Sequence, residues 1–414
     1  MTFAAGLLDQ QIHDAALMRR ADADLLSLAF MDARNRTLRW LAAFEGVKFE
    51  GVLRSFDPPW WLAGQAAWFQ EYWIARHLQR SRGAGADPGS LRLASIEPHA
   101  DDWFDPNGSA SMQRWLMQGP DEASLHAYMA ATLDTTLELL EKAEGDETAL
   151  HSFRQALVHE DLLGERLAEL IQALDLPADR QAGLVECGLW PELSSRQRRD
   201  AVGLPGQRWL LGSEPGAWVP PAEQWAHPVQ LFEFEIDAQL VCWDQFTEFI
   251  DDGGYDDRQW WTDDGWDWLE VTERRAPRYV EQMSGAVMAR RQGRLQRLPA
   301  GQAVVHVSAH EADAWCRWAG RRLPSEAEWE AAACQASARG FAWGQVLEWV
   351  AGRPRAYPDA PAASQDQIKA LGADARVLRG ASAWGSARLK HARARRFESA
   401  SRDSLFVGFR TCAL

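Results

Sequence analysis

The chain of 414 residues lacks the features that mark several common classes of protein. Its five cysteines are scattered, odd in number and without C-x-x-C spacing, so they predict neither a disulfide framework nor a thiolate zinc site. Basic residues are outnumbered, and the net charge of −15 argues against nucleic acid or an anionic membrane as a partner. We therefore expect a small molecule or a protein as the partner, and a cytoplasmic location.

Long apolar runs and several catalytic motifs are missing as well. No stretch approaches the roughly 18 apolar residues of a membrane span, and the N-terminal segment does not have the layout of a signal peptide. The sequence contains no Gly-rich phosphate loop, no G-x-S-x-G motif and no internal repeat. Tryptophan is abundant instead, with 22 residues, which indicates aromatic-rich motifs.

Residues 1–180 have the pattern of helices. The stretch PPWWLAGQAAWFQEYWIARHLQR opens with prolines suited to a first helical turn, and its aromatic residues recur at helical spacing, so Gln65 is expected to point inward. Two later stretches, DEASLHAYMAATLDTTLELLEKA and ETALHSFRQALVHEDLLGERLAELIQALDLP, are amphipathic. With the N-terminal segment they predict a bundle of about four helices, in which residues 83–122 form a long surface connection.

Residues 196–414 follow a different pattern. HPVQLFEFEID and RVLRG are typical of strands, whereas HEADAWCRWAG and SEAEWEAAAC predict short helices. Each helix is preceded by a capping-box signature, formed by Ser308 with Glu311 and by Ser325 with Glu328. GRPRAYPDAPAASQDQ is expected to be a loop. Many short elements without βαβ alternation predict a compact α+β domain.

These stretches resemble the nonheme-iron sulfoxide synthases of ergothioneine biosynthesis, including their selenoneine-synthase branch. The similar segments include PPWWLAGQAAWFQEYWIAR, HEDLLGERLAEL, VVHVSAHEADAWCRWAGRRLPSEAEWEAAA and FVGFRTCAL. The resemblance implies a DinB-like four-helix bundle over residues 1–180 and a formylglycine-generating-enzyme-like domain, related to C-type lectins, over residues 196–414. It also implies an iron(II) ion, held by three histidines, that activates O2 and joins a thiol or selenol to the imidazole of a trimethylated histidine.

Carried over by position, the three ligands of the family correspond to Gln65, His159 and Leu163. Leucine cannot bind a metal, and an amide oxygen suits hard cations better than iron(II). We therefore expect no cofactor, or a weakly held one, with iron(II) bound only if the site is remodelled. Leu163 also belongs to an apolar helical stripe that predicts core packing; its members are Leu163, Leu167, Leu170 and Leu174.

The polar residues around these positions have simpler interpretations. His159 is expected to be a buried, hydrogen-bonded histidine rather than a ligand. Glu160, Asp161 and Glu165 point in different directions on a helix, so we expect them to be solvated or to support the site indirectly.

The segment ARRFESASRDSLFVGFR differs from the corresponding family segment, which in part lines the substrate pocket. Arg396 and Glu398 replace an Asn-like position and an aromatic or acidic one. A guanidinium beside a trimethylammonium group would be repelled by about 4 kcal/mol at 4 Å in an effective dielectric constant near 20. Arg402 stands where it would contact a substrate carboxylate, although a surface arginine is an equally good interpretation.

Two other candidates favour structural roles. His306 lies outside the helix that Ser308 caps and His310 lies in its first turn, so the two need not converge on a metal. Cys412 has no cysteine close to it in sequence, which disfavours the copper-dependent chemistry of formylglycine-generating enzymes and predicts a buried thiol.

The leading hypothesis is a homolog that has lost the parent reaction and acts as a binding or regulatory protein. The alternative is an active O2-dependent enzyme that forms C–S or C–Se bonds on a histidine-derived substrate with a remodelled metal site. The replaced residues at two of the three ligand positions favour the first.

Overall fold

The computed structural model describes residues 10–49, 51, 53, 55–143, 145–195, 197–283 and 286–414. The chain divides into two compact units. The first comprises Met1–Trp190 and Trp384–Leu389, and the second comprises Pro191–Ala383 and Lys390–Leu414. The change of unit at Pro191 lies between the predicted limits at residues 180 and 196. The return of Trp384–Leu389 to the first unit has no counterpart in the sequence-based division.

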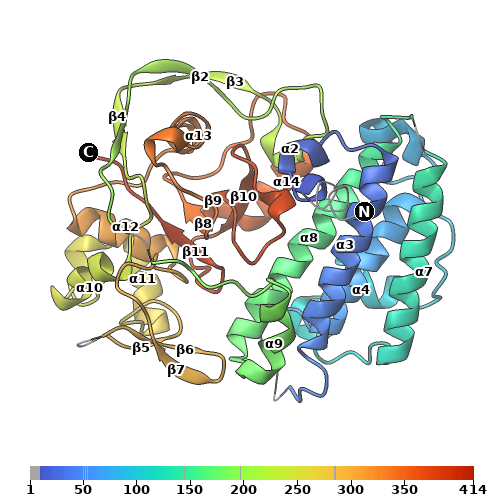
Figure 1. The fold of residues 1–414 in the computed structure, drawn as a ribbon, viewed down its shortest axis with the longest axis horizontal. Coiled ribbons are helices and arrows are strands. Elements are labelled where there is room, and N and C mark those ends of the chain that lie inside the picture. Colours follow the sequence, from blue (N-terminus) through green and yellow to red (C-terminus); the bar gives the residue numbers. More distant parts are fainter. Residues whose placement is uncertain are drawn as a thin grey trace. The chain divides into compact units, whose positions relative to one another are not determined.

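Helices form the first unit (Figure 1). The four long ones are α3 (Ala23–Ala42), α4 (Pro59–Gln70), α7 (Glu122–Glu141) and α8 (Leu150–Ala173). The shorter elements are α2 (Ala15–Met18), the π-helical turn η1 (Glu71–Ala75), η2 (Arg80–Gly85), α5 (Ala100–Phe104), α6 (Ser111–Arg114), α9 (Ala178–Glu186) and η7 (Ala387–Leu389). Helices α5 and α6 and the end of η2 lie within the predicted long connection, which is therefore less irregular than its glycines and prolines indicate.

Local signals in the sequence account for where these helices begin. Asp22 caps α3 by accepting a hydrogen bond from the Leu25 backbone N–H, and Asp121 caps α7 in the same way from Ser124. Pro59 occupies the first position of α4, where the missing N–H costs nothing.

The long helices pack against one another. Both α3 and α4 contact α7 and α8. The core between them is made of fully buried aliphatic and aromatic side chains, among them Leu26, Phe30, Leu140, Phe153 and Leu157. Each such side chain stabilises the fold by roughly 1.5–3 kcal/mol. The DinB-like assignment of this helical unit stays a prediction.

The second unit is a mixture of short strands and helices, as expected for an α+β domain. Its main sheet has the order β10-β9-β8-β11 and is antiparallel except for the parallel pair β11 and β8. These strands are β8 (Leu347–Trp349), β9 (Ala375–Gly380), β10 (Arg395–Ser399) and β11 (Val407–Phe409).

Three smaller antiparallel sheets complete the strands of this unit, with the orders β1-β4, β2-β3 and β5-β6-β7. Their strands are β1 (Val202–Leu204), β2 (Gln207–Leu211), β3 (His227–Leu231), β4 (Phe234–Ile236), β5 (Val280–Gln282), β6 (Met288–Arg291) and β7 (Arg294–Arg297). The predicted strands in HPVQLFEFEID and RVLRG are thereby confirmed as β3, β4 and β9.

The helices of this unit are α10 (Trp243–Asp251), α11 (Asp263–Thr272), α12 (Ala309–Trp318), α13 (Glu326–Gln335) and α14 (Ala362–Leu371), with short turns η3 (Pro221–Glu223), η4 (Arg258–Trp260), η5 (Ser337–Arg339) and η6 (Gly372–Asp374). Both predicted capping boxes are confirmed, at Ser308 and Ser325. The prediction of a loop over residues 352–367 was wrong in part, because α14 begins directly after Pro361. Proline is well suited to the residue before a helix.

A buried ion pair lies in the middle of the main sheet. Glu348 and Arg410 are both fully buried, and the guanidinium donates to both carboxylate oxygens at 2.5 and 2.8 Å. The indole N–H of Trp329 donates to the same carboxylate at 2.8 Å, which ties α13 to β8. The buried carboxylate and the buried guanidinium thus both have hydrogen-bond partners inside the core, which offsets the cost of removing them from water.

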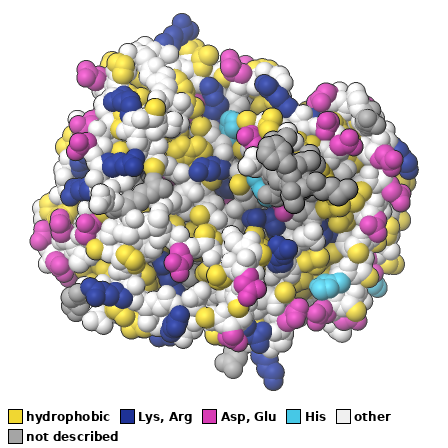
Figure 2. Space-filling view, viewed as in Figure 1, with side chains coloured by type: hydrophobic (Ala, Val, Ile, Leu, Met, Phe, Trp, Pro, Cys, Tyr) yellow, Lys and Arg dark blue, Asp and Glu magenta, His cyan; other side chains and the backbone are white. Residues whose placement is uncertain are grey.

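The visible surface carries charges of both signs. Acidic and basic side chains are interspersed on the face shown in Figure 2, where Lys and Arg do not gather into one basic patch. Among the residues that the structure describes, no helix is both long enough and apolar enough to cross a membrane.

Replacement of Glu348 tests how much the buried ion pair contributes to the stability of the fold. Glu348→Ala leaves the Arg410 charge buried without its partner, so we expect the free energy of unfolding to fall by about 3–5 kcal/mol. Urea denaturation followed by tryptophan fluorescence measures this change. Asp366→Ala removes half of an exposed pair with Lys369 and serves as the control, with an expected loss below about 1 kcal/mol. Equal losses in the two variants would contradict the assignment.

Candidate functional site

Helices α4 and α8 bring Gln65 and His159 together, although 94 residues separate them in the chain. Nearly all of α4 is buried, and Gln65 is only 3% exposed, as its place among aromatic residues predicts. His159 lies near the middle of α8 and is partly buried. Two of the three positions that correspond to the ligands of the family therefore meet inside the first unit.

The two side chains form a hydrogen bond with each other. The Nε2 atom of His159 lies 2.5 Å from the Oε1 atom of Gln65. With the amide oxygen as acceptor, the imidazole carries its proton on Nε2, and that nitrogen has no lone pair for a metal. The His159 ring also stacks on Phe69, with 3.9 Å between the ring centroids. His159 thus contacts the Gln65 amide through Nε2 and the Phe69 ring through its face.

Burial determines the charge of this histidine. It lowers the pKa of His159 from the ordinary 6.5 to about 4, because a desolvated imidazolium is disfavoured. The ring is therefore neutral near pH 7. The expectation of a hydrogen-bonded histidine agrees with this geometry.

Leu163 lies one turn after His159 on α8 and offers only hydrocarbon. The predicted core stripe is only partly correct: Leu167 and Leu170 are fully buried, whereas Leu163 and Leu174 are partly exposed. The apolar period identifies one face of the helix, but the depth of each residue also depends on which neighbours cover it. Leu163 therefore cannot be credited with the full stabilisation of a buried leucine.

The acidic residues of α8 are buried, so the expectation of solvated groups is wrong, whereas the alternative of groups that support the site indirectly stays a prediction. Glu160 is fully buried, receives a 2.8 Å hydrogen bond from the Nε atom of Arg34 and a 3.0 Å bond from Thr37, and also pairs with Gln70. Asp161 is 5% exposed and Glu165 is 3% exposed. A carboxylate costs several kcal/mol to bury unless it is paired, so such residues need partners inside the protein.

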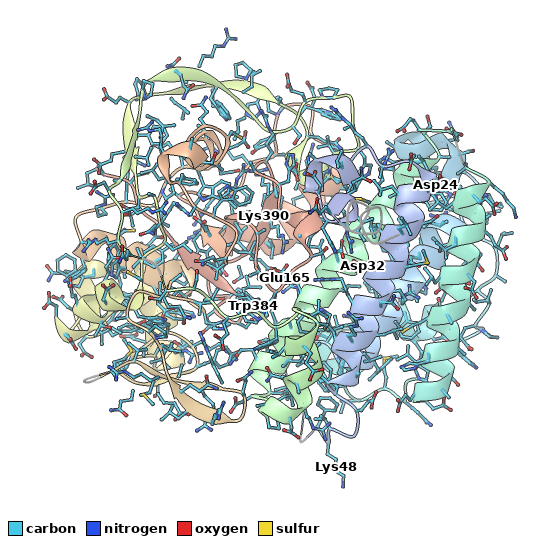
Figure 3. The ribbon with its side chains drawn as sticks, viewed as in Figure 1. Asp24, Asp32, Lys48, Glu165, Trp384 and Lys390 are labelled. Carbon is cyan, nitrogen blue, oxygen red and sulfur yellow. The ribbon has the colours of Figure 1, made fainter. Side chains whose placement is uncertain are left out.

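The partner of Asp161 comes from the far end of the chain. Arg388, from the segment Trp384–Leu389 of the same unit, donates from Nε and Nη2 to the two oxygens of Asp161, at 2.9 Å each. Its Nη1 atom lies 2.8 Å from Asp32 on α3. Asp32, Glu165 and Trp384 are labelled in Figure 3. Sequence reasoning missed Arg388, because no local pattern links residues 227 positions apart.

A small cavity lies beside this pair. Its volume is about 10 Å³, enough for roughly one water molecule, and its lining includes Arg36, Trp40, Glu160, Asp161, Glu165 and Ser386. Burial lowers the pKa of Arg36 from its ordinary value, opposed by the nearby charge of Asp161. The cavity is too small for an organic substrate.

The residues present do not fit an iron(II) ion. Among the described residues, no group of three or more His, Cys, Asp and Glu side chains is arranged to hold a metal. One imidazole, an amide and a hydrocarbon replace the three imidazoles that the family resemblance implies. The carboxylates nearest in sequence are engaged by Arg34 and Arg388. The donor set thus disagrees with the cofactor of the family.

The substrate-pocket candidates lie in the second unit, on β10 and in the segment that follows it. Arg396 and Glu398 are partly exposed and alternate along β10 with the buried Arg395 and Phe397. The Nη1 atom of Arg402 lies 3.9 Å from Glu398, and its Nε donates to Ser404 at 3.0 Å. The structure thus brings Glu398 and Arg402 together, while their role towards a substrate stays a prediction.

The remaining candidates, the two histidines His306 and His310 and the thiol of Cys412, have surroundings that suit structural roles. The Nδ1 atom of His306 lies 2.7 Å from the Leu405 carbonyl oxygen, and burial lowers its pKa to about 3. His310 stacks on Trp268 and is also buried. Cys412 is fully buried, and burial raises the pKa of its thiol to about 12, so it is a poor nucleophile.

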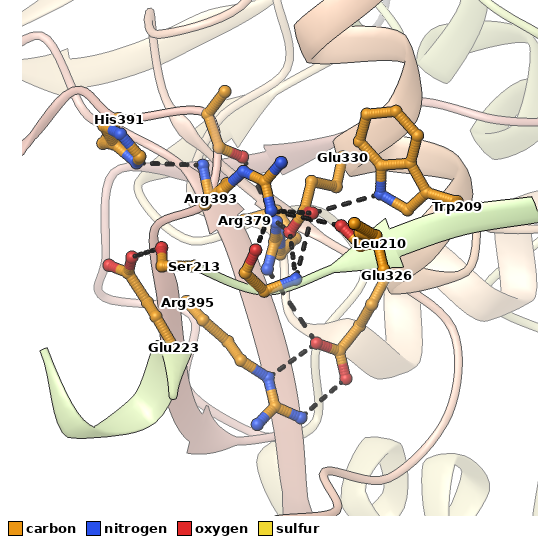
Figure 4. A network of polar contacts seen from close by, with 12 residues as sticks. Trp209, Leu210, Ser213, Glu223, Glu326, Glu330, Arg379, His391, Arg393 and Arg395 are labelled. Carbon is orange, nitrogen blue, oxygen red and sulfur yellow. Dashed lines mark hydrogen bonds and ion pairs between the residues drawn. The ribbon is translucent and has the colours of Figure 1, made fainter. Parts of the chain in front are cut away.

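A second polar network, drawn in Figure 4, was not predicted. Glu330 is fully buried and receives a 2.5 Å hydrogen bond from Arg379, while Arg395 donates twice to Glu326, at 2.6 and 2.8 Å. Arg393 adds a third guanidinium, 3.7 Å from Glu330. These contacts join α13 to β9 and β10. Sequence reasoning passed over these arginines because their partners are distant in the chain.

Comparison with known proteins defines the class of the second unit first. Residues 191–364 match the family model of the sulfatase-modifying factor enzyme 1-like domain. The formylglycine-generating enzyme of Streptomyces coelicolor is 33% identical over 171 residues, covering 38% of this chain and 54% of that protein.

Relatives that cover most of the chain are hercynine oxygenases. The one from Mycolicibacterium smegmatis is 30% identical over 389 residues, which are 89% of this chain and 81% of that protein. The one from Mycolicibacterium thermoresistibile is 29% identical over 360 residues, covering 84% and 72% of the two chains. The chain therefore belongs to the hercynine oxygenase family, the sulfoxide synthases with a formylglycine-generating-enzyme-like domain.

The lowered pKa of His159 predicts a specific pH dependence of stability. Because the pKa is about 4 in the folded chain and 6.5 ordinarily, the unfolded chain binds more protons between these values, and stability falls as the pH drops through that window. We expect His159→Asn to reduce the loss of unfolding free energy between pH 7 and pH 4 by about 3 kcal/mol.

Urea denaturation at a series of pH values measures this difference. His126→Asn, at an exposed position on α7, is the matched control and should follow the wild-type profile. A His159→Asn profile parallel to that of the wild type would show that His159 is not desolvated as described.

Proposed function

We propose that this member of the hercynine oxygenase family does not carry out an iron(II)-dependent oxygenase reaction and acts as a binding or regulatory protein. The single observation that carries the proposal is the hydrogen bond between His159 and Gln65, with Leu163 at the third position. The two polar side chains that would have to bind the metal form a hydrogen bond with each other instead. The third position supplies no lone pair.

The charges around α8 support the same conclusion. Metal sites that lose histidines can use carboxylates in their place, and α8 carries Glu160, Asp161 and Glu165. Glu160 and Asp161 are held by guanidinium groups in short ion pairs. To bind a metal, either carboxylate would have to leave an arginine that is itself buried, and an unpaired buried charge is strongly unfavourable. Recruitment of these groups by a metal is therefore costly.

We further propose that the helical unit is of the DinB-like type and that the protein retains a small-molecule or protein ligand. Arg396, Glu398 and Arg402 are the candidates for contacting such a ligand. The alternative, an active enzyme with a remodelled metal site that forms C–S or C–Se bonds, requires ligands other than the family set. The described residues provide no group of three donors for it.

Metal analysis of the purified protein tests the proposal. From iron-supplemented cells we expect wild-type protein with far less than one equivalent of iron, since one imidazole and an amide hold iron(II) weakly. Gln65→His with Leu163→His restores three imidazoles and should raise the bound iron towards one equivalent. Inductively coupled plasma mass spectrometry measures both.

The single variants Gln65→His and Leu163→His are the matched controls, because each supplies only two imidazoles and should remain low in iron. The proposal would be overturned by wild-type protein with about one equivalent of iron and O2 consumption in the presence of hercynine and a thiol. Low iron in the double variant as well would mean that the groups which orient the ligands have also changed.

A further inference from the structure

The second unit contains a large cavity that none of the residues discussed above line. Its volume is about 650 Å³, within the range of small-molecule sites. One wall is α10, and the other is formed by residues just before β6 and by the end of β7 with the residues that follow it. The lining comprises Trp243, Asp244, Thr247, Glu248, Asp251, Met283, Ala286, Val287, Arg297, Leu298, Pro299 and Ala300.

The spacing of residues on α10 explains the chemistry of the first wall. Trp243, Phe246 and Phe249 are buried and fix the helix on the core. Asp244, Glu248 and Asp251 are exposed, and their spacing of four and three places them along one side of the helix. Helix α10 thus presents a row of carboxylates to the cavity.

These carboxylates are only partly compensated. Asp244 accepts hydrogen bonds from the Cys242 thiol and from the Gln245 backbone N–H, both 2.7–2.8 Å long. Within the described part of the chain, Glu248 and Asp251 form no ion pair. Arg297 is the one basic residue in the lining. Three carboxylates against one guanidinium leave the cavity with an excess of negative charge, which attracts a cation.

Apart from Arg297, the opposite wall is apolar. Val287 and Leu298 are buried, at 6% and 5% exposure, and Met283 and Pro299 lie beside them in the lining. This arrangement suits a ligand whose body is apolar and whose charge lies at one end. A metal ion or an inorganic cation would leave the apolar wall unused.

Trp243 provides a second and independent indication of a ligand. It is 1% exposed, it lines the cavity, and its indole N–H has no hydrogen-bond partner among the residues that the structure describes. A buried N–H without an acceptor is unfavourable, and such groups are uncommon in native proteins. A ligand acceptor that reached the Nε1 atom of Trp243 would satisfy this donor.

We propose that this cavity is a binding site for a small organic cation with an apolar body and a hydrogen-bond acceptor. Glu248 and Asp251 attract the ammonium or guanidinium end, and the wall with Val287 and Leu298 packs against the body. The site shares no residue with the α4 and α8 site, so it goes beyond the proposed function and does not depend on it.

Binding of three related phenols tests the charge requirement. Tyramine carries an ammonium group, tyrosol has a neutral hydroxyl in its place, and 4-hydroxyphenylacetate carries a carboxylate. Isothermal titration calorimetry with wild-type protein should give tyramine an affinity at least about tenfold higher than that of the other two. Its affinity should also fall as sodium chloride is added, whereas that of tyrosol should not.

The variant Glu248→Gln with Asp251→Asn removes two charges at exposed positions and should preserve the fold. We expect it to weaken tyramine binding about tenfold and to leave tyrosol binding unchanged. Glu233→Gln, an exposed carboxylate in the same unit outside the cavity, is the matched control and should bind tyramine like the wild type. Absence of tyramine binding at millimolar concentration, or equal binding by the double variant, would overturn the proposal.

Discussion

Glu160 and Asp161, two carboxylates buried on α8, are each paired with an arginine from another segment, and these pairs tie α8 to its neighbours in the helical unit. Arg34 from α3 pairs with Glu160, and Arg388 pairs with Asp161. Each pair is held by two or more hydrogen bonds, which offsets the cost of removing a carboxylate from water. The register of α8 against its neighbours is therefore set by polar contacts as well as by the apolar core. His159 and Gln65 meet within this framework.

The charge state of the contact between His159 and Gln65 follows from the same constraint. The imidazole of His159, which stacks on Phe69, is most stable when neutral because burial disfavours its charged form, and a neutral amide is a suitable partner for it. A site that binds iron(II) needs the opposite arrangement, in which several lone pairs point at one empty position. The chain belongs to the hercynine oxygenase family, and His159 and Gln65, at two of the positions discussed above, are joined by an internal hydrogen bond.

Local features of the fold were predictable from the sequence, and features that depend on distant partners were not. The starts of α12 and α13 follow from capping boxes within four residues, and the inward direction of Gln65 follows from helical spacing. The burial of Glu160 and Asp161 could not be predicted, because it depends on Arg34 and Arg388, which lie on other segments. Leu163 is less buried than predicted, because an amphipathic pattern does not indicate which neighbours cover a residue. The cavity beside α10 was not predicted, because two separate segments of the chain form it.

The position of Arg388 has a consequence for how this protein can be divided. The helical unit is discontinuous in sequence, since Trp384–Leu389 belongs to it and Pro191–Ala383 does not. A fragment cut after the last helix of the N-terminal half would keep Asp161 and Asp32 and lose the guanidinium that binds both. Separate expression of the two halves, or exchange of one half with that of a relative, therefore removes a core contact of the helical unit.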